Sequence, residues 1–441
     1  MISSISKLLR IRFVQDAATL QIGKFVGISC GMVTSIAYIN LLGIGGYGKY
    51  AIVMAFAGIF GIVTNLGQQA TLTTFFSRSY GQQNKREMTQ IAQYYLYTSI
   101  AVAIFLLILA LFMPTISGII YKDNNIGKLA RLVFFSSIFE FGFSYVSILL
   151  QITREIKILA FLENTKIVLQ VSLAILLLWL GFGIAGILYS SLSISILFFI
   201  VSIGLNKWIN SKYPLPRLKE ILAKPNWKQI LKYNRAGIWI AVDKNVGNLY
   251  PTAFLFVLSL SAPESIVGLF RLAFKLAGLP TSFALSSISR MAGSVIPSIA
   301  GKDIKSLKST LIKLAMHSVF IHTAITIAGM ILVPIFLPYV YGENMGIAVY
   351  PFLAITAMQL SLAVHVIMTP IFRLKNKSMI PAIINSIGMA ISISVFFILA
   401  GALTETRALY VSIFLYHLIS LSAVFFIIYF VKEISKKSVL S

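Results

Sequence analysis

Residues 91–113, IAQYYLYTSIAVAIFLLILALFM, form a stretch of 23 residues without a single charged side chain. The hydrocarbon core of a bilayer is about 30 Å thick and is crossed by about 20 apolar residues in a helix. Similar stretches recur along the chain, so we predict an all-α integral membrane protein with about 12 transmembrane helices. The predicted spans are residues 22–42, 49–77, 91–113, 129–152, 163–181, 184–205, 236–260, 266–289, 310–337, 346–370, 379–401 and 407–431.

The composition of the whole chain excludes a soluble fold. Of its 441 residues, 58% are hydrophobic and only 11% are charged, whereas soluble domains carry about 25% charged residues. The net charge of +24 lies in short segments between apolar stretches, which indicates membrane orientation rather than nucleic-acid binding. The single cysteine, Cys30, excludes an intramolecular disulfide, and no Cys/His spacing typical of a metal site occurs.

The distribution of basic residues predicts the orientation of the chain. One alternate set of connecting segments, including both termini, holds 28 Lys and Arg residues, whereas the opposite set holds five. Because the richer side faces the cytoplasm, we expect a multi-pass protein with both termini cytoplasmic.

A weak internal repeat predicts two similar halves. A shift of 220 residues superposes the apolar stretches and places Lys24 on Lys244 and Gly48 on Gly268. We therefore expect a six-helix lobe at residues 1–205, a basic cytoplasmic linker at 206–235 that lies partly on anionic lipid, and a second six-helix lobe at 236–441. Because six is even, the repeats are parallel, and a pathway between them would work by alternating access.

Charged residues within apolar stretches are the candidate functional residues, because each costs about 2.5–3.5 kcal/mol at the centre of a membrane helix. The basic ones predict a cationic cavity that suits an anionic substrate, and they are Lys24, Lys244, Arg271 and Lys275. Arg271 and Lys275 are four residues apart and share a helix face. Two alternatives stay open. The long side chains of Lys24 and Arg271 can extend so that their charged groups reach the membrane surface. Asp243 can neutralise Lys244.

Other polar residues in the spans are weaker candidates. Glu140 is either the partner of one of these cations or the carrier of a coupling proton. Gln68 and Gln69 line a cavity that binds sugar hydroxyls, or they link helices. The four histidines, His317, His322, His365 and His417, all fall in or near spans of the second half. A lone membrane histidine is more often a packing residue than a proton relay.

No motif for nucleotide chemistry is present. Each Gly-Lys pair lacks the following Ser or Thr of a phosphate-binding loop. Gly43–Gly48, GIGGYG, has the letters of a dinucleotide motif but joins two membrane stretches, so we interpret it as a flexible turn. The sequence predicts no cofactor and no catalytic residue, with H+ or Na+ as a possible coupling ion.

Three stretches resemble a known family. Leu41–Tyr50, LLGIGGYGKY, is similar to the "LG…YG.Y" turn of polysaccharide flippases of the multidrug/oligosaccharidyl-lipid/polysaccharide (MOP) exporter superfamily. The stretch Gly67–Gly81 is similar too, and so is Val340–Glu343 with the following Tyr350-Pro351. The family usually has an arginine near the first of these motifs, where this chain has Ile39-Asn40, so a role carried by that arginine is not transferred.

The resemblance implies a flippase in the bacterial inner membrane. Its expected substrate is an undecaprenyl-diphosphate-linked oligosaccharide such as an O-antigen repeat unit, moved to the periplasmic leaflet without ATP. Expected partners are membrane lipids and polysaccharide polymerase or assembly proteins, with no nucleic acid. Two alternatives stay open. One is a multidrug or cation antiporter of the same superfamily. The other is an integral-membrane glycosyltransferase or polymerase, which the short external loops disfavour.

Overall fold

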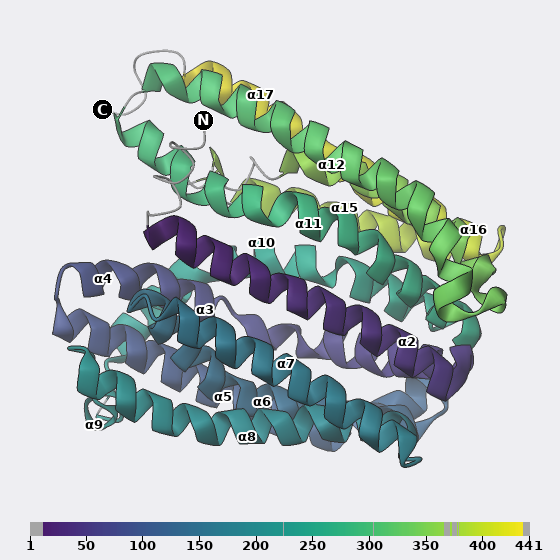
Figure 1. Cartoon of the computed structure of the whole chain (residues 1–441), viewed down its shortest axis with the longest axis horizontal. Coiled ribbons are helices and arrows are strands. Elements are labelled where there is room, and N and C mark those ends of the chain that lie inside the picture. The colour runs from purple at the N-terminus through teal and green to yellow at the C-terminus, as the bar shows by residue number, and fades with distance from the viewer. Residues whose placement is uncertain are drawn as a thin grey trace. The chain divides into compact units, whose positions relative to one another are not determined.

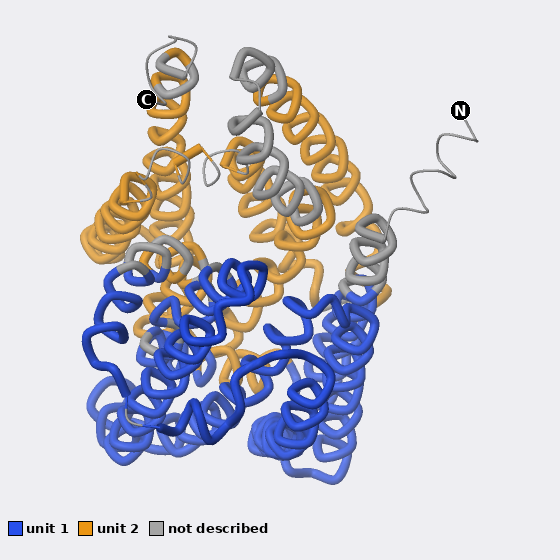
Figure 2. Tube along the Cα trace, turned by 90° about the vertical axis from the view of Figure 1, so that its left-hand side faces the viewer, with its two compact units in different colours: residues 1–43, 53–241 blue, residues 44–52, 242–441 orange. Residues whose placement is uncertain are grey.

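The computed structural model describes residues 12–223, 225–302, 304–365, 371–372, 377 and 379–434. The chain divides into two compact units, whose described residues lie within 12–43 and 53–241 for one and within 44–52 and 242–434 for the other (Figure 2). Ten described helices are long and apolar enough to cross a membrane, and Leu249–Leu258 is a shorter apolar helix. The predicted all-α membrane fold is confirmed.

Unit 1 is built mainly from α2 and from four long helices that follow it. Its elements are α2 (Arg12–Phe60) except residues 44–52, η1 (Gly61–Asn65), α3 (Gln68–Thr71), the π-helix η2 (Leu72–Phe76), α4 (Ser77–Gly81), α5 (Lys85–Tyr121), α6 (Asn124–Ile152), α7 (Ile156–Trp179), α8 (Gly183–Lys212), α9 (Leu218–Ile221) and the first part of α10 (Trp227–Leu258), which enters unit 2 after Ala241. Helices α5 to α8 run alongside one another (Figure 1). Since a 37-residue helix is about 55 Å long, α5 extends beyond the hydrocarbon into water.

Unit 2 contains the remaining helices. They are α11 (Glu264–Lys302), α12 (Ile304–Tyr341), η3 (Glu343–Ala348), α13 (Val349–Met358), η4 (Gln359–Ser361), α15 (Met379–Ala400), α16 (Glu405–Leu421) and α17 (Ala423–Ile434). Many predicted spans lie inside longer helices, because the polar ends of these helices continue past the apolar stretch by which a span is recognised.

Polar residues in the connections begin the helices of unit 1. The side chain of Asn84 accepts a hydrogen bond from the Glu87 backbone N–H at 3.1 Å and caps α5. Asp123 caps α6 in the same way through the Asn125 N–H at 2.8 Å. Each cap satisfies a backbone donor that the first helical turn leaves without a partner.

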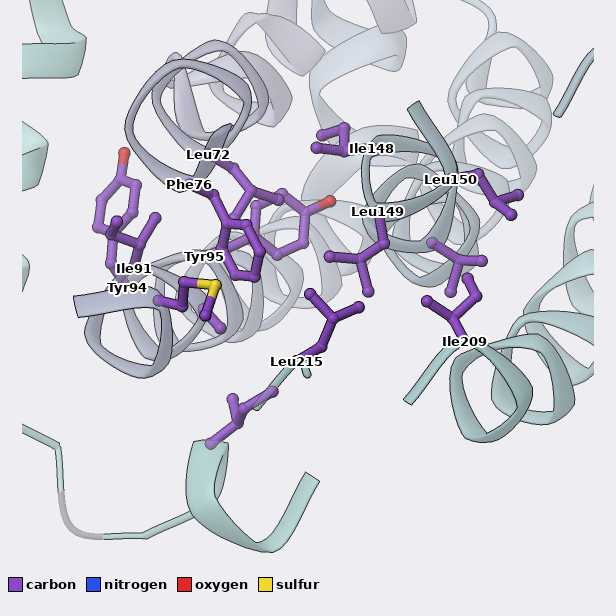
Figure 3. Packing of buried hydrophobic residues seen from close by; sticks show 14 of the residues in the cluster. Leu72, Phe76, Ile91, Tyr94, Tyr95, Ile148, Leu149, Leu150, Ile209 and Leu215 are labelled. Atoms are coloured by element: carbon purple, nitrogen blue, oxygen red, sulfur yellow. The ribbon is translucent and has the colours of Figure 1, made fainter. Parts of the chain in front are cut away.

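An apolar core joins the irregular part of the second predicted span to its neighbours (Figure 3). Leu72 and Phe76 of the π-helix are fully buried against Tyr95 of α5 and Leu149 of α6. The Tyr95 hydroxyl donates to the Phe141 carbonyl at 2.9 Å. The core therefore fixes the position of a segment whose own hydrogen-bonding pattern changes four times between residues 60 and 77.

The predicted flexible turn at Gly43–Gly48 is wrong in its extent. Only Gly43 leaves the helical region, with φ 71° and ψ 171°, and the chain is helical again from Ile44. Within a bilayer a backbone group that leaves the helix has no water to bond, so glycines there remain helical unless a break is supported. The result is a single kink, beyond which residues 44–52 belong to unit 2.

Gly48 and Gly268, which the 220-residue shift superposes, pack directly against each other within unit 2. A methyl group at Gly48 would lie 1.7 Å from the Glu264 carbonyl oxygen, and one at Gly268 would lie 2.7 Å from the Ile44 carbonyl oxygen. The two helix backbones can approach this closely only because neither residue has a Cβ.

The short helix α9 is held on α5 by an exposed ion pair. Lys85 Nζ lies 2.7 Å from Glu220 Oε1, and Gln93 of α5 donates to the Glu220 carbonyl at 3.3 Å. The hydrogen bond from Lys85, with one from the Arg217 backbone N–H, holds the pKa of Glu220 below its ordinary value.

We expect acid to weaken this attachment. Because the pKa of Glu220 is lowered on folding, its contribution is present above the unfolded pKa of about 4.3 and is lost as the pH falls through the lower folded value. Limited proteolysis of the segment after α9 should therefore accelerate below about pH 4. In the variant Lys85→Met the acid-induced acceleration should be smaller, and an identical pH profile would contradict the assignment.

Candidate functional site

Arg271 and Lys275 of α11 form the described part of the predicted cationic site. Both side chains are partly buried and lie one helical turn apart within unit 2. The guanidinium carbon of Arg271 lies 5.1 Å from the centroid of the Tyr50 ring. Tyr47, which is only 2% exposed, and Tyr50 are hydrogen-bonding partners of the same guanidinium.

Two tyrosines thus stabilise the arginine without neutralising it. A cation over an aromatic face gains about 0.5–2 kcal/mol, and hydroxyl oxygens accept its N–H groups. Tyr50 and Lys275 make further interactions within the chain. The tyrosines leave the positive charge of Arg271 available to an anion, and Lys275 adds a second positive charge on the same face of α11.

These tyrosines were missed by the sequence analysis, which interpreted their segment as a turn. They reach α11 because the kink at Gly43 sends Ile44–Ile52 into unit 2, where Gly48 packs on Gly268. Tyr47 and Tyr50 lie three residues apart on one helical face, immediately around Gly48. This helical spacing of the two tyrosines was the feature of the sequence from which they could have been identified.

Three of the predicted site residues cannot be placed. The backbones of Lys24, Asp243 and Lys244 are helical, but their side chains lie outside the described part of the structure. Their membership of the cationic site, and the pairing of Asp243 with Lys244, stay predictions.

Glu140 belongs to a separate polar group within unit 1. Its carboxylate pairs with Lys166 of α7, and Ser195 of α8 donates to Glu140 Oε1 at 2.7 Å. The ammonium group also lies 4.7 Å from the Phe143 ring centroid. Among the side chains that the structure describes, the basic partner of Glu140 is therefore Lys166, and not Arg271 or Lys275.

Lys166 was missed because, at the start of the predicted span 163–181, it was counted with the basic residues of the cytoplasmic segment 153–166. Helix α7 begins at Ile156, so Lys166 lies ten residues into it, about 15 Å along its axis. The charged residues at the start of α7 lower its hydropathy, which shortened the predicted span to 163–181. The ion pair compensates for burying Lys166, whose side chain is 13% exposed.

Removing this carboxylate should destabilise unit 1. We expect Glu140→Gln to reduce the free energy of unfolding by roughly 1–2 kcal/mol, because Lys166 would lose its counter-ion; the 36% exposure of Glu140 limits the effect. Thermal unfolding of the purified protein in detergent measures it. The exposed pair Lys85–Glu220 provides the control, because Glu220→Gln should change the stability by less than about 1 kcal/mol. Equal losses in the two variants would contradict the expectation.

The two glutamines have structural contacts. Gln68 is buried and its amide donates to the Thr64 carbonyl at 2.8 Å, whereas Gln69 is exposed and donates to Ser144 at 3.2 Å. The Gln69 contact joins α3 to α6, as the helix-linking alternative expects, whereas the Gln68 contact is local to its own segment. A role of either residue in binding sugars stays a prediction. In the described residues no group of three or more His, Cys, Asp and Glu side chains is arranged to hold a metal ion.

Comparison with known proteins decides the family. The model of the family described as "polysaccharide biosynthesis protein" matches residues 13–301, which is more than half of the chain. The chain belongs to the polysaccharide biosynthesis protein family. A search of curated proteins found no match.

The fold of this family member is that of the MATE transporters. An inward-facing multidrug resistance MATE transporter of the MOP superfamily matches with a TM-score of 0.71 and 16% identity, over 96% of this chain and 99% of the other. The outward-facing form matches with a TM-score of 0.67 and 17% identity, over 98% and 99%. A eukaryotic MATE transporter matches with a TM-score of 0.65 and 14% identity, over 96% and 98%. At these identities the likeness concerns the fold.

Proposed function

We propose that this polysaccharide biosynthesis protein flips an undecaprenyl-diphosphate-linked oligosaccharide across the bacterial inner membrane, from the cytoplasmic to the periplasmic leaflet. The observation that carries the proposal is Arg271, held over Tyr50 within a membrane helix with Lys275 one turn away. Two positive charges in an apolar setting suit a diphosphate, and arginine binds phosphate oxygens in a planar, bidentate manner. Family membership supplies the link to polysaccharide.

The inward-facing and outward-facing structures that share this fold support transport by alternating access, and in our proposal an ion gradient drives it. In this proposal the tyrosines hold Arg271 in place while the diphosphate passes, and the sugar chain and lipid tail make weaker contacts. Both termini lie in the cytoplasm, and polymerase or assembly proteins receive the product on the other side. No covalent step on the substrate is required.

Complementation tests the proposal. The intact gene is expressed in a strain that lacks its own polysaccharide flippase but retains the glycosyltransferases, and surface polysaccharide is measured. Restoration of polymer is expected. A companion assay follows a fluorescent lipid-diphosphate oligosaccharide in proteoliposomes, where its movement between leaflets supports the proposal without dependence on the host.

The likeness to multidrug MATE transporters supports a second candidate, export of organic cations. The paired cations on α11 disfavour a cationic substrate by repulsion. Drug resistance on expression, without restored polymer and without movement of the lipid-linked oligosaccharide, would favour this second candidate and overturn the first.

A further inference from the structure

Three histidines lie inside unit 2 and each is hydrogen-bonded to a hydroxyl group. They are His322 of α12, His365, which follows η4, and His417 of α16. His322 is 0% and His417 is 3% exposed, and His365 is partly buried. Ionisable side chains in membrane helices commonly mark ion or proton pathways. The contacts of each ring are therefore informative.

His417 has a partner on each ring nitrogen. Nε2 lies 2.8 Å from the Tyr250 hydroxyl and Nδ1 lies 3.0 Å from the Ser361 hydroxyl. A hydroxyl group can donate or accept, so both hydrogen bonds persist when the ring gains a proton and becomes a double donor. The Tyr250 ring is itself fixed by stacking on Tyr416, with centroids 4.5 Å apart. The ring is therefore held in an environment that serves both of its protonation states.

His365 contacts α16, the helix that also carries His417. Ser420 lies three residues after His417, on the same helical face, and its hydroxyl lies 2.7 Å from His365 Nε2. The same hydroxyl is 3.2 Å from Asn385 Oδ1. Since the amide oxygen can only accept, Ser420 donates to Asn385 and accepts from Nε2–H of His365.

His322 lies on the other side of η4. Its Nε2 is 3.1 Å from the Thr281 hydroxyl, which donates to Gln359 Oε1 at 3.3 Å. Because Thr281 gives its only proton to Gln359, Nε2 of His322 carries a proton and Nδ1 keeps its lone pair. Within the described residues that buried Nδ1 has no hydrogen-bonding partner. A buried acceptor of this kind is a place for a proton to bind.

The three groups are joined by short segments of chain. Gln359 and Ser361 are the two ends of η4, so the His322 and His417 networks attach to one turn. His417 lies twelve residues into the span Glu405–Tyr429 and His322 eleven residues into Leu311–Tyr341, about 16–18 Å from those ends, whereas His365 ends the span Met345–His365. His365 thus lies at the end of a span, whereas His322 and His417 lie near the middle of theirs.

The side chains that contact these rings, directly or through a hydroxyl group, come from five elements. They are Tyr250 of α10, Thr281 of α11, Gln359 and Ser361 of η4, Asn385 of α15, and Tyr416 and Ser420 of α16. The charged residues of these helices lie farther along them: Lys275 precedes Thr281 by six residues, and Arg407 precedes His417 by ten. Tyrosine and histidine are thus the titratable residue types in the contacts given above.

We propose that His417 is a proton-binding site in unit 2, with His322 and His365 as neighbouring sites, and that the proton is the ion that drives transport. His417 takes up one proton to become an imidazolium, which it later releases. The Tyr250 and Ser361 hydroxyls accept hydrogen bonds from the two ring N–H groups of that imidazolium. This proposal rests on the proposed transport function for its coupling, whereas the binding of the proton itself does not depend on the substrate.

The test uses the full chain in proteoliposomes with an imposed pH gradient and the fluorescent lipid-diphosphate oligosaccharide. The wild type is expected to move the lipid at least tenfold faster with the gradient than without it. His417→Gln should lose this acceleration while retaining the slow, gradient-independent movement. The matched control is His317→Gln, because His317 is exposed on α12 and bonds the Lys313 backbone carbonyl; it should behave as the wild type.

A second variant guards against misfolding of the first. Tyr250→Phe keeps the ring stacked on Tyr416 and removes only the hydroxyl at His417, so it should reduce the acceleration severalfold while the protein elutes and unfolds as the wild type. Proton uptake of the purified protein after a pH jump gives a readout without substrate, and His417→Gln should take up fewer protons.

The outcomes separate the two proposals. Acceleration in His417→Gln equal to the wild type, or a wild type that flips the lipid without any effect of the gradient, overturns the role of His417 in coupling and leaves flipping intact. A wild type that does not move the lipid overturns the proposed function, and proton uptake then tests proton binding at His417 alone: unchanged uptake in His417→Gln overturns it.

Discussion

Replacing Arg271 with alanine is expected to reduce movement of the lipid-linked oligosaccharide by about 100-fold. A charged partner buried away from water contributes roughly 2–5 kcal/mol to binding, and the diphosphate would lose its planar partner. Arg271→Lys keeps the charge but loses the flat face over Tyr50, so an intermediate rate is expected. Initial rates in proteoliposomes measure both effects, and surface polysaccharide in the complemented strain follows them.

The control for this prediction is Arg407→Ala, since Arg407 is exposed at the beginning of α16. That variant should transport at the wild-type rate. Lys275→Ala tests the second cation of the site separately and should also slow transport. Full activity in both Arg271→Ala and Lys275→Ala would remove the cationic site from the mechanism.

Gly48→Ala is expected to prevent stable folding of unit 2. Its methyl group would lie 1.7 Å from the Glu264 carbonyl oxygen, so the two helices must separate, at a cost of more than about 4 kcal/mol. The yield of monodisperse protein in detergent and the thermal unfolding temperature should both fall sharply. Because Arg271 depends on Tyr47 and Tyr50 beside this glycine, any remaining protein should transport poorly.

Gly45→Ala is the matched control for the glycine. It lies one turn earlier on the same helix, and a methyl group there would meet no atom within 4 Å. Alanine in a helix is favoured over glycine by about 0.5–1 kcal/mol, so the control should be as stable as the wild type or slightly more stable. Similar stabilities of the two variants would show that the helices tolerate separation at Gly48.

The sequence was sufficient for the fold class because hydropathy and length alone determine which segments cross a bilayer. It was insufficient where a polar residue lies deeper in its helix than the apolar stretch indicates, as with Lys166, which is three residues into the predicted span but ten residues into α7. Glycine was misleading for a related reason: in water GIGGYG is typical of a turn, but in a membrane only Gly43 departs from the helix.

For the site, the sequence identified the two cations and their common face but gave no sign of what holds them. Arg271 meets Tyr50 across more than 200 residues of chain, a contact that depends on the kink at Gly43. The same holds for His417, whose partners Tyr250 and Ser361 lie on other helices. Whether the cations of α11 bind the substrate stays a prediction.

The kink at Gly43 also sets an order of events during synthesis. Residues 44–52 leave the ribosome among the first of the chain, yet the unit to which they belong is completed only with residues beyond 242. At about 5–20 residues per second, Tyr47 and Tyr50 are made roughly 10–40 s before Arg271. Residues 44–52 are thus synthesised long before their final neighbours exist, and residues 242–441 cannot complete unit 2 without them.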